Sequence, residues 1–311
     1  MGRNRKGEAI SGWINLDKPL EMTSTQAIGK IRRLLNAQKI GHAGTLDPLA
    51  TGILPIALGE ATKTIPYMQD RIKTYEFTVT WGEQRDTDDA EGQIIATSDH
   101  RPSEQDIRSL LPRYTGEIEQ IPPLFSAIKV QGARAYDLAR AGQILDLKSR
   151  IVYIETLTLK ACRANEADFE MICGKGTYVR ALARDLAEDL GTKGYVSALR
   201  RTSVGPFTSA NAISLDKLEQ MDYVAARNEA LLPLHCVLDD IPALQLKQDE
   251  AAKLRSGQKV ALISRPDFTR LTQAGLGGKE TAEALALLND APVAIIETQG
   301  PEIYPVRVFN I

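Results

Sequence analysis

The sequence has little of what metal-binding, disulfide-bonded and membrane-spanning proteins are built from. Its 311 residues include three cysteines and three histidines, and these do not follow C-x-x-C or H-x-x-x-H spacing. Such scatter argues against a zinc site and against a disulfide framework. No apolar run approaches the roughly 18 residues that a membrane-spanning helix needs. We therefore expect no metal, no membrane association and a cytoplasmic location.

Motifs for nucleotides and calcium are missing as well. Gly174–Thr177 and Gly278–Glu280 combine glycine with lysine, but neither ends in the G-K-[ST] sequence that holds nucleotide phosphates. The acidic run Asp86–Gly92 lacks both the glycine at the sixth position and the closing glutamate of a calcium loop. These segments therefore give no reason to expect a bound nucleotide or metal.

Charge is nearly balanced, since 38 lysines and arginines oppose 40 aspartates and glutamates. The distribution is uneven, because residues 1–80 and 126–210 carry a positive surplus and residues 81–125 a negative one. Binding of RNA phosphates requires a locally basic face rather than a basic protein. The positive segments are candidate RNA contacts, although ordinary solvated surfaces produce similar surpluses.

Hydrophobic periodicity predicts a mixture of strands and helices. Tyr75–Trp81 alternates with a period of two, which is typical of a strand with one buried face. In Arg150–Lys160 the apolar positions change phase near Glu155, which predicts a β-bulge there. Further strands are expected at 13–16, 52–58, 123–130 and 168–173, with a turn at 131–132, and helices at 26–35, 103–111, 134–140 and 179–190.

The length of 311 residues is sufficient for about two domains. We expect a mobile basic tail at 1–11 and a larger domain at 12–238. After Leu238, short apolar stretches read as strands around a helix near 250–256, separated by a polar stretch at 264–290. The strands are expected at 242–246, 260–263, 293–297 and 304–309. Residues 239–311 are thus predicted to form a small β-rich domain.

The segment Gly41–Pro55, GHAGTLDPLATGILP, places one carboxylate, Asp47, among small and apolar residues. Gly44 allows backbone conformations closed to other residues, and Pro48 restricts Asp47 to extended geometry. Asp47 is therefore expected on a shaped loop that leads into a buried strand. An Asp-Pro pair is also an ordinary helix start, so a helix that begins at Pro48 and is capped by Asp47 is the alternative.

As a whole, Gly41–Pro55 closely resembles the signature of the bacterial tRNA pseudouridine synthase B (TruB) family. Three further stretches agree with that family: Pro123–Arg140, Gly174–Arg180 and Ser197–Phe207. The resemblance covers residues 12–208 well and the C-terminal part only by position. It implies an α+β pseudouridine synthase fold, with a central mixed, mainly antiparallel sheet flanked by helices. It also implies a PUA-like RNA-binding domain at 239–311.

The resemblance implies that the chain isomerises uridine 55 in the T loop of tRNA to pseudouridine. In this reaction the N-glycosidic bond breaks, the base turns while it is held, and a carbon–carbon glycosidic bond forms. Nothing is oxidised and no group is donated, so no cofactor is expected. The expected partner is the T arm of tRNA, without a guide RNA, and the protein is expected to be a monomer.

The resemblance also assigns catalytic roles to three residues. Asp47 would be the nucleophile, presented to a nucleotide flipped out of the folded RNA. A carboxylate in an apolar loop tends to take up a proton, so a nearby cation is needed, and Arg180 matches that cation. Tyr75 matches a tyrosine that stacks on the target base and is a candidate for proton transfer. Its place in the strand pattern fits a core aromatic residue equally well.

Four other residues match substrate-binding or supporting positions of the family. His42 would contact the RNA near the flipped nucleotide. Tyr178 and the backbone of Leu199 would touch the substrate. Lys18, which we include with the substrate-binding residues, matches with Pro19 a loop that supports the site.

Several alternatives stay open. Arg180 and Arg184 lie four residues apart on one helix flank, where either could form a surface ion pair with Asp189 or Glu188. The chain could be a non-catalytic RNA chaperone that unfolds and refolds tRNA, or the related guide-dependent synthase of ribonucleoprotein particles. The sequence also leaves open whether Asp47 attacks the sugar carbon or the base.

Overall fold

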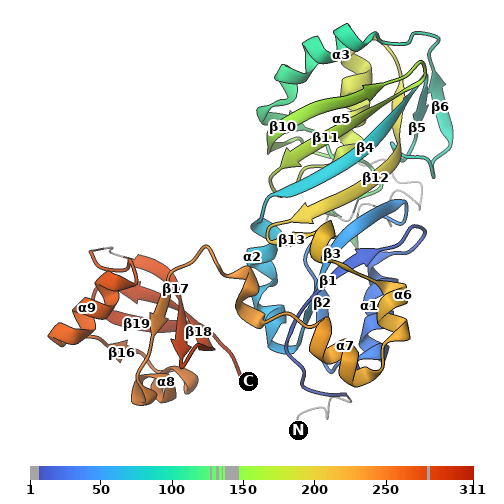
Figure 1. Ribbon diagram of the computed structural model, residues 1–311. Coiled ribbons are helices and arrows are strands. Elements are labelled where there is room, and N and C mark those ends of the chain that lie inside the picture. Colours follow the sequence, from blue (N-terminus) through green and yellow to red (C-terminus); the bar gives the residue numbers. More distant parts are fainter. Residues whose placement is uncertain (1–6, 127, 131–132, 135, 137–146, 279–280) are drawn as a thin grey trace.

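The computed structural model describes residues 7–126, 128–130, 133–134, 136, 147–278 and 281–311 (Figure 1). These residues form a large mixed sheet with helices beside it and a second, smaller sheet in the C-terminal part. Both features agree with the predicted α+β class. The helix expected at 134–140 falls mostly outside the described residues. Among the residues that are described, no helix is long and apolar enough to cross a membrane.

The large sheet has ten strands in the order β14-β1-β3-β12-β4-β11-β10-β7, with β2 paired to β3 and β13 to β12. The strands are β14 (Ile213–Ser214), β1 (Gly12–Lys18), β3 (Ala50–Leu58), β12 (Gly194–Val204), β4 (Lys73–Trp81), β11 (Glu166–Cys173), β10 (Arg150–Cys162), β7 (Gly116–Gln120), β2 (Ile40–His42) and β13 (Phe207–Thr208). The pairs β1–β14 and β3–β12 are parallel, and the other pairs are antiparallel. The prediction of a mixed, mainly antiparallel sheet is confirmed.

Two local predictions for these strands are confirmed. On β4, alternate side chains are buried: Tyr75, Phe77, Val79 and Trp81. Along β10, Ile154 pairs with Cys173 and Thr156 with Ile172, so Glu155 is the extra residue of a bulge. Both features arise from the pattern of apolar side chains within one strand.

Helices cover the two halves of the sheet separately (Figure 1). Beside β1 and β3 lie α1 (Ser24–Leu34), α6 (Leu215–Gln220) and α7 (Tyr223–Glu229); beside β4, β10 and β11 lie α3 (Glu104–Leu110) and α5 (Val179–Asp189). Smaller elements are α2 (Ile65–Asp70), the paired strands β5 (Glu83–Arg85) and β6 (Ile94–Thr97), and the paired strands β8 (Lys129–Val130) and β9 (Ala133–Arg134).

The helix ends follow local signals in the sequence. Thr23 caps α1 through a reciprocal pair of hydrogen bonds with Gln26, which is a capping box. Helix α5 is followed by its C-cap residue Leu190 and then by Gly191. Gly191 has φ +70°, a conformation that favours glycine. These ends agree with the predicted helices to within about two residues, the usual uncertainty of helix boundaries.

Strand β12 joins the two halves of the sheet (Figure 1). On one side, Leu199–Arg201 pairs in parallel with Ala50–Gly52 at the start of β3. On the other side, the same residues pair with Tyr75–Phe77 in β4. This register places the loop that precedes β3, including Asp47, two strands away from Tyr75.

The contact between β3 and β12 is close because residue 52 has no side chain. Gly52 has φ +98°, and a Cβ atom there would lie 2.2 Å from the backbone oxygen of Arg201. We expect Gly52→Ala to lower the free energy of unfolding by about 2–4 kcal/mol, because backbone strain and steric overlap add. Urea unfolding followed by circular dichroism measures the change.

Gly29 provides the matched control for this variant. It lies in the middle of α1, and a Cβ atom there would meet nothing within 4 Å. Gly29→Ala should raise the free energy of unfolding by about 0.5–1 kcal/mol, because alanine favours the helix. Equal stabilities for the two alanine variants would contradict the close contact at Gly52.

The C-terminal part forms a five-stranded sheet in the order β15-β17-β18-β19-β16. Its elements are β15 (Ala243–Gln245), α8 (Gln248–Arg255), β16 (Val260–Ala261), α9 (Arg265–Gln273), β17 (Thr281–Leu288), β18 (Ala291–Gln299) and β19 (Glu302–Val308). The prediction of a β-rich C-terminal part is confirmed. No helix or strand was predicted in the polar stretch at 264–290, but this stretch contains α9 and β17.

Residues 8–11, which we expected to belong to a mobile tail, are held by the fold. Ile10 is only 2% exposed, and the backbone N–H of Glu8 donates to the backbone oxygen of Asn36 at 2.7 Å. Residues 8–11 are therefore part of the larger domain, because an apolar side chain within them is buried in its core.

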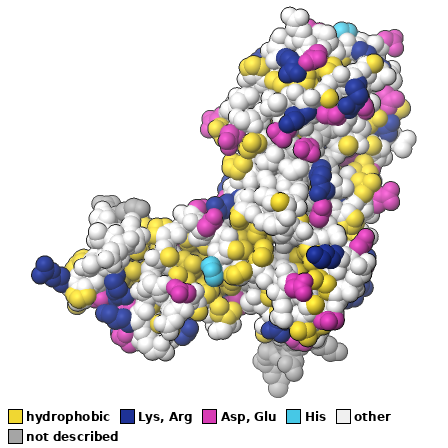
Figure 2. All heavy atoms as spheres, in the orientation of Figure 1, with side chains coloured by type: hydrophobic (Ala, Val, Ile, Leu, Met, Phe, Trp, Pro, Cys, Tyr) yellow, Lys and Arg dark blue, Asp and Glu magenta, His cyan; other side chains and the backbone are white. Residues whose placement is uncertain are grey.

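The two sheets meet through an apolar contact. Leu285 and Phe309 from the C-terminal part share a buried cluster with Trp13 and Met68. Figure 2 shows hydrophobic side chains gathered where the two parts meet. Polar contacts add to the cluster, since the Lys63 ammonium donates to the backbone oxygen of Val308 at 2.7 Å. The C-terminal part is thus packed against the larger domain.

Candidate active site

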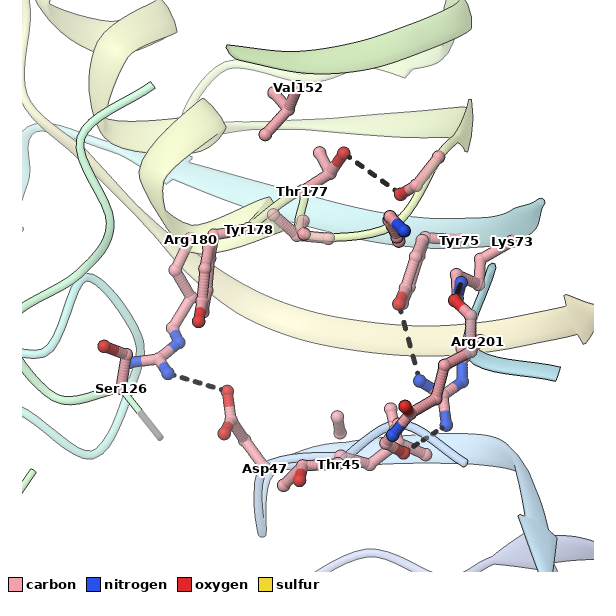
Figure 3. Close-up of a pocket in the computed structure, with 18 of the residues that line it drawn as sticks. Thr45, Asp47, Lys73, Tyr75, Ser126, Val152, Thr177, Tyr178, Arg180 and Arg201 are labelled. Carbon is pink, nitrogen blue, oxygen red and sulfur yellow. Dashed lines mark hydrogen bonds and ion pairs between the residues drawn. The ribbon is translucent and has the colours of Figure 1, made fainter. Parts of the chain in front are cut away.

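A cleft of about 680 Å³ lies where β3, β4 and β12 meet the N-terminal end of α5 (Figure 3). Its lining includes Asp47, Tyr75, Tyr178, Arg180 and Leu199, which are five of the seven residues proposed from the sequence. Three of them come from different strands or loops and two from the start of α5. The fold therefore collects residues that are up to 152 positions apart in the sequence.

Asp47 lies on a loop rather than at a helix start. Residues 48–49 form a turn that closes when the Ala50 N–H donates to the Asp47 backbone oxygen at 3.1 Å. The buried hydroxyl of Ser24 bonds to both the backbone oxygen and the backbone N–H of Leu46, at 3.0 and 2.9 Å. The alternative of a helix capped by Asp47 is wrong, and the loop is fastened to α1.

Arg180 forms an ion pair with Asp47 at 2.9 Å (Figure 3). The Arg180 side chain is 7% exposed and that of Asp47 is 40% exposed, so the carboxylate opens to the cleft while the cation stays inside. Arg180 also donates to the backbone oxygens of Thr87 at 2.9 Å and Phe125 at 3.0 Å, and Asp89 lies at 3.5 Å. The guanidinium is therefore held from several sides.

The acidic turn near Asp88 supplies the partners of both arginines on α5. Arg184 pairs with Asp88 at 3.1 Å and with Asp185 at 2.9 Å. The predicted surface pairs with Asp189 or Glu188 are wrong for Arg184, and for Arg180 as well. The turn thus helps to fix Arg180, which lines the cleft, and Arg184, which lies one helical turn further along α5.

Tyr75 is both a core residue and a cleft residue. It is 9% exposed and belongs to the buried cluster formed by β4, β10, β11 and α5. It also lines the cleft. Its hydroxyl lies 3.5 Å from Nη1 of Arg201. Burial raises the pKa of Tyr75, and the Arg201 guanidinium opposes that shift.

Tyr178 and Leu199 lie on two other walls of the cleft. The backbone of Tyr178 exchanges two hydrogen bonds with the Gln120 side chain, at 2.8 and 3.1 Å. The Arg150 guanidinium lies 5.8 Å from the centre of the Tyr178 ring. These contacts present one face of an aromatic ring next to a cation at the cleft wall.

His42 and Lys18 are not among the residues that line the cleft. His42 lies at the end of β2, where burial and the nearby Arg201 lower its pKa and favour the neutral ring. Lys18 is fully buried, and its ammonium donates to the backbone oxygens of Pro19 at 2.8 Å, Met22 at 2.7 Å and Pro48 at 3.4 Å. Lys18 therefore supports the Asp47 loop from behind.

This position of Lys18 leads to a pH prediction. Burial lowers the pKa of Lys18 to about 8, although Asp47 opposes the shift. Above that pH the amine loses one of the three N–H groups that contact Pro19, Met22 and Pro48, so we expect the rate of the reaction proposed below to fall. Single-turnover rates between pH 6.5 and 9.5 measure this, with binding of RNA followed at the same pH values.

The loss should occur without unfolding. The folded pKa of Lys18 lies below that of the unfolded chain, so this group stabilises the fold as pH rises from about 8 to 10.5. Lys73, whose pKa burial also lowers to about 8, serves as a control, because Lys73→Arg stays charged and should keep the alkaline loss. A constant rate up to pH 9.5 would contradict the prediction.

Two buried cations at the cleft were not identified from the sequence, namely Arg201 and Lys73. Arg201 is 1% exposed and Lys73 is 6% exposed. Arg201 follows Arg200 on β12, and successive strand residues point to opposite faces. One of two adjacent arginines therefore had to face inward, which is the signal that the sequence offered.

Comparison with solved structures identifies the class of fold. The chain in a crystal structure of a Cbf5-Nop10-Gar1 complex matches with a TM-score of 0.69 and 23% identity, covering 96% of this chain and 84% of that one. The chain in a structure of an H/ACA RNP bound to a substrate RNA gives the same TM-score at 21% identity, covering 100% and 92%. The protein thus has the pseudouridine synthase fold, as predicted.

Comparison of sequences identifies the family. Residues 32–179 match the N-terminal domain of the TruB family pseudouridylate synthases, and residues 180–242 match the C-terminal domain of tRNA pseudouridylate synthase B. The tRNA pseudouridine synthase B of Rhodospirillum rubrum is 51% identical over the full length of both chains, and that of Caulobacter vibrioides is 50% identical over both. The chain belongs to the TruB family of pseudouridylate synthases, which confirms the resemblance seen in the sequence.

Proposed function

We propose that the protein isomerises uridine 55 in the T loop of tRNA to pseudouridine, with Asp47 as the nucleophile. The observation that carries the proposal is the 2.9 Å contact between Asp47 and Arg180 at an open cleft that Tyr75 also lines. Relatives about 50% identical over the full chain carry the name tRNA pseudouridine synthase B, which supports tRNA as the substrate.

The reaction requires a carboxylate that reaches the nucleotide and is held in one orientation. Asp47 would add to the nucleotide while the bond between N1 and C1′ breaks, and would leave when C5 bonds to C1′. Both C1′ of the ribose and C6 of the base are positions for the attack. Arg180 would orient the carboxylate, because its other N–H groups are fixed by Thr87 and Phe125.

The cleft also has to hold a base that is out of its stack. Its volume of about 680 Å³ lies within the range of roughly 300–1,000 Å³ that is usual for ligand pockets. Flipping a nucleotide costs a few kcal/mol of stacking, and contact with an aromatic face recovers part of it. Tyr75 and Tyr178 would provide these faces, while Leu199 closes a third wall.

The remaining predicted residues would act around this centre. Lys18 would help to keep the Asp47 loop in place through its contact with the Pro48 backbone oxygen, while Pro19 and Met22 hold the ammonium. His42, at the end of β2 and close to Gly44 in sequence, would meet the RNA at the rim. The C-terminal sheet would be the PUA-like RNA-binding domain, since it is a separate β-rich unit packed against the larger domain.

We further propose that the protein acts as a monomer in the cytoplasm and without a guide RNA. The solved structures with guide-dependent particles match at 21–23% identity, which supports the fold alone. The much closer relatives are named for tRNA.

The decisive experiment incubates the pure protein with an unmodified tRNA transcript and maps pseudouridine along the product. Conversion at position 55, in the transcript and in an isolated T-arm hairpin, is expected. Conversion that needs an added guide RNA would favour the guide-dependent synthase. A protein that refolds tRNA but converts no uridine would favour the RNA chaperone instead.

A further inference from the structure

A second charged group lies at the Tyr75 side of the cleft (Figure 3). Its centre is Arg201, which is 1% exposed on β12. The Arg201 Nε donates to the backbone oxygen of Ile53 at 2.7 Å, and Nη2 donates to that of Gly44 at 3.0 Å. Nη1 lies 3.5 Å from the hydroxyl oxygen of Tyr75. Two contacts thus fix the guanidinium, and the third directs its charge at the tyrosine.

This part of the cleft has a surplus of positive charge. Lys73 donates to the backbone oxygens of Gln69 and Arg71. In the part of the chain that the structure describes, neither Arg201 nor Lys73 forms an ion pair with a carboxylate. Carbonyl oxygens satisfy N–H groups but do not neutralise their charge. Negative charge that develops beside these side chains would therefore be stabilised.

We propose that Arg201 is a positioning residue that stabilises the negative charge on Tyr75 while the Tyr75 hydroxyl carries a proton from one atom of the uracil to another. This inference rests on the proposed function, because it concerns a step of that reaction.

The proton balance of the isomerisation requires such a carrier. As the bond from N1 to C1′ breaks, N1 keeps the electron pair, takes a proton from the Tyr75 hydroxyl and leaves a phenolate. After the base has turned, C5 bonds to C1′ and releases its proton to that phenolate. Tyr75 ends as it began, and nothing is oxidised or consumed. The balance is the same whether Asp47 attacks the sugar or the base.

The surroundings of Tyr75 show why a cation is needed for this step. Burial raises the pKa of Tyr75, and the negative charge of Asp47 adds to the increase. Arg201 acts in the opposite direction, both through its charge and through its contact with the hydroxyl. Without Arg201, the buried phenolate would have to form without the cation that contacts its oxygen, which is unfavourable.

The test compares Arg201→Gln with Arg200→Gln as its matched control. Arg200 precedes Arg201 on β12, but it is half-buried and pairs with Asp17 at 2.7 Å. We expect Arg201→Gln to lower the single-turnover rate on tRNA by about 10²–10³-fold, as for loss of a donor that stabilises developing negative charge. Affinity for tRNA should stay within about threefold for both variants, because Arg201 is buried and Arg200 is paired with Asp17.

Chemical rescue distinguishes this role from a merely structural one. A fluorinated tyrosine at position 75 has a more acidic hydroxyl and nearly the same shape. We expect it to raise the rate of Arg201→Gln by about tenfold or more and that of the unsubstituted chain by less than about threefold. Titration of ¹³C-labelled Tyr75 followed by NMR should show a higher pKa in Arg201→Gln.

Each outcome bears on the inference. An equal rate effect of the fluorinated tyrosine in both backgrounds, or an unchanged Tyr75 titration, would overturn it and leave Arg201 a structural residue. Arg201→Lys keeps a cation and should recover part of the rate. If Arg201→Gln does not fold, Arg201→Lys replaces it in the rate measurement with fluorinated tyrosine and in the titration of Tyr75. Conversion of uridine by the unsubstituted chain is measured first. If that chain converts no uridine, the proposed function fails; if it does, the later results test the role of Arg201 alone.

Discussion

Asp47→Asn is expected to abolish conversion of uridine 55 while tRNA binding remains. The amide has nearly the shape of the carboxylate but is not a nucleophile, so we expect the single-turnover rate to fall by about 10⁴-fold or more. Arg180 would keep its contacts with Thr87, Phe125 and Asp89 in this variant. The cleft should therefore keep its form.

The measurement is a single-turnover assay with tRNA in limited amount, combined with filter binding of the same tRNA. Asp70→Asn is the matched control, because Asp70 also lines the cleft but pairs with Lys175 at 2.8 Å and not with Arg180. It should keep the rate to within about threefold, as expected for the loss of an exposed ion pair. Conversion by Asp47→Asn at more than about one hundredth of the original rate would exclude Asp47 as the nucleophile.

Features that depend on near neighbours in the sequence could be predicted before the structure was known. The alternation along β4 and the bulge at Glu155 are each determined by a few successive side chains. The Asp47 loop was recognised because its signature is a single uninterrupted segment. The pairing of Asp47 with Arg180 followed from the family resemblance and not from any local pattern.

Features that depend on distant neighbours were missed. Thr281–Leu288 reads as a helix former by propensity and becomes a strand because β15 and β18 pair with it. Arg184 finds its partner Asp88 some 96 positions away. Arg201 is buried because the carbonyl oxygens of Gly44 and Ile53 meet it there. Only the folded chain brings these groups together.

The residues of the site likewise divide into those that the sequence showed and those that it did not. Those that touch the cleft, such as Tyr178, belong to motifs that the sequence displays as a unit. Arg201, which was missed, is held in place by backbone oxygens, and these carry no sequence signal. A sequence therefore reveals the residues that would contact a substrate more readily than the residues that position them.

Arg180→Lys is expected to lower the rate strongly, although less than loss of the nucleophile, even though the positive charge is kept. The planar guanidinium of Arg180 contacts Asp47, Thr87 and Phe125 at the same time, because its N–H groups point in fixed directions. An ammonium is a single point of charge, and it would leave at least one of these partners unsatisfied. We expect the single-turnover rate to fall by about 10²–10³-fold.

The control for this variant lies one helical turn further along α5. Arg184→Lys makes the same exchange at a residue that pairs with Asp88 and Asp185 and makes no contact with Asp47. It should change the rate by less than about fivefold and reduce mainly the stability, because its contacts are structural. Binding of tRNA should be unchanged in both variants. Equal losses of rate in the two variants would mean that α5 has only a structural role. A loss confined to Arg180→Lys would show that Asp47 requires the geometry of the guanidinium as well as its charge.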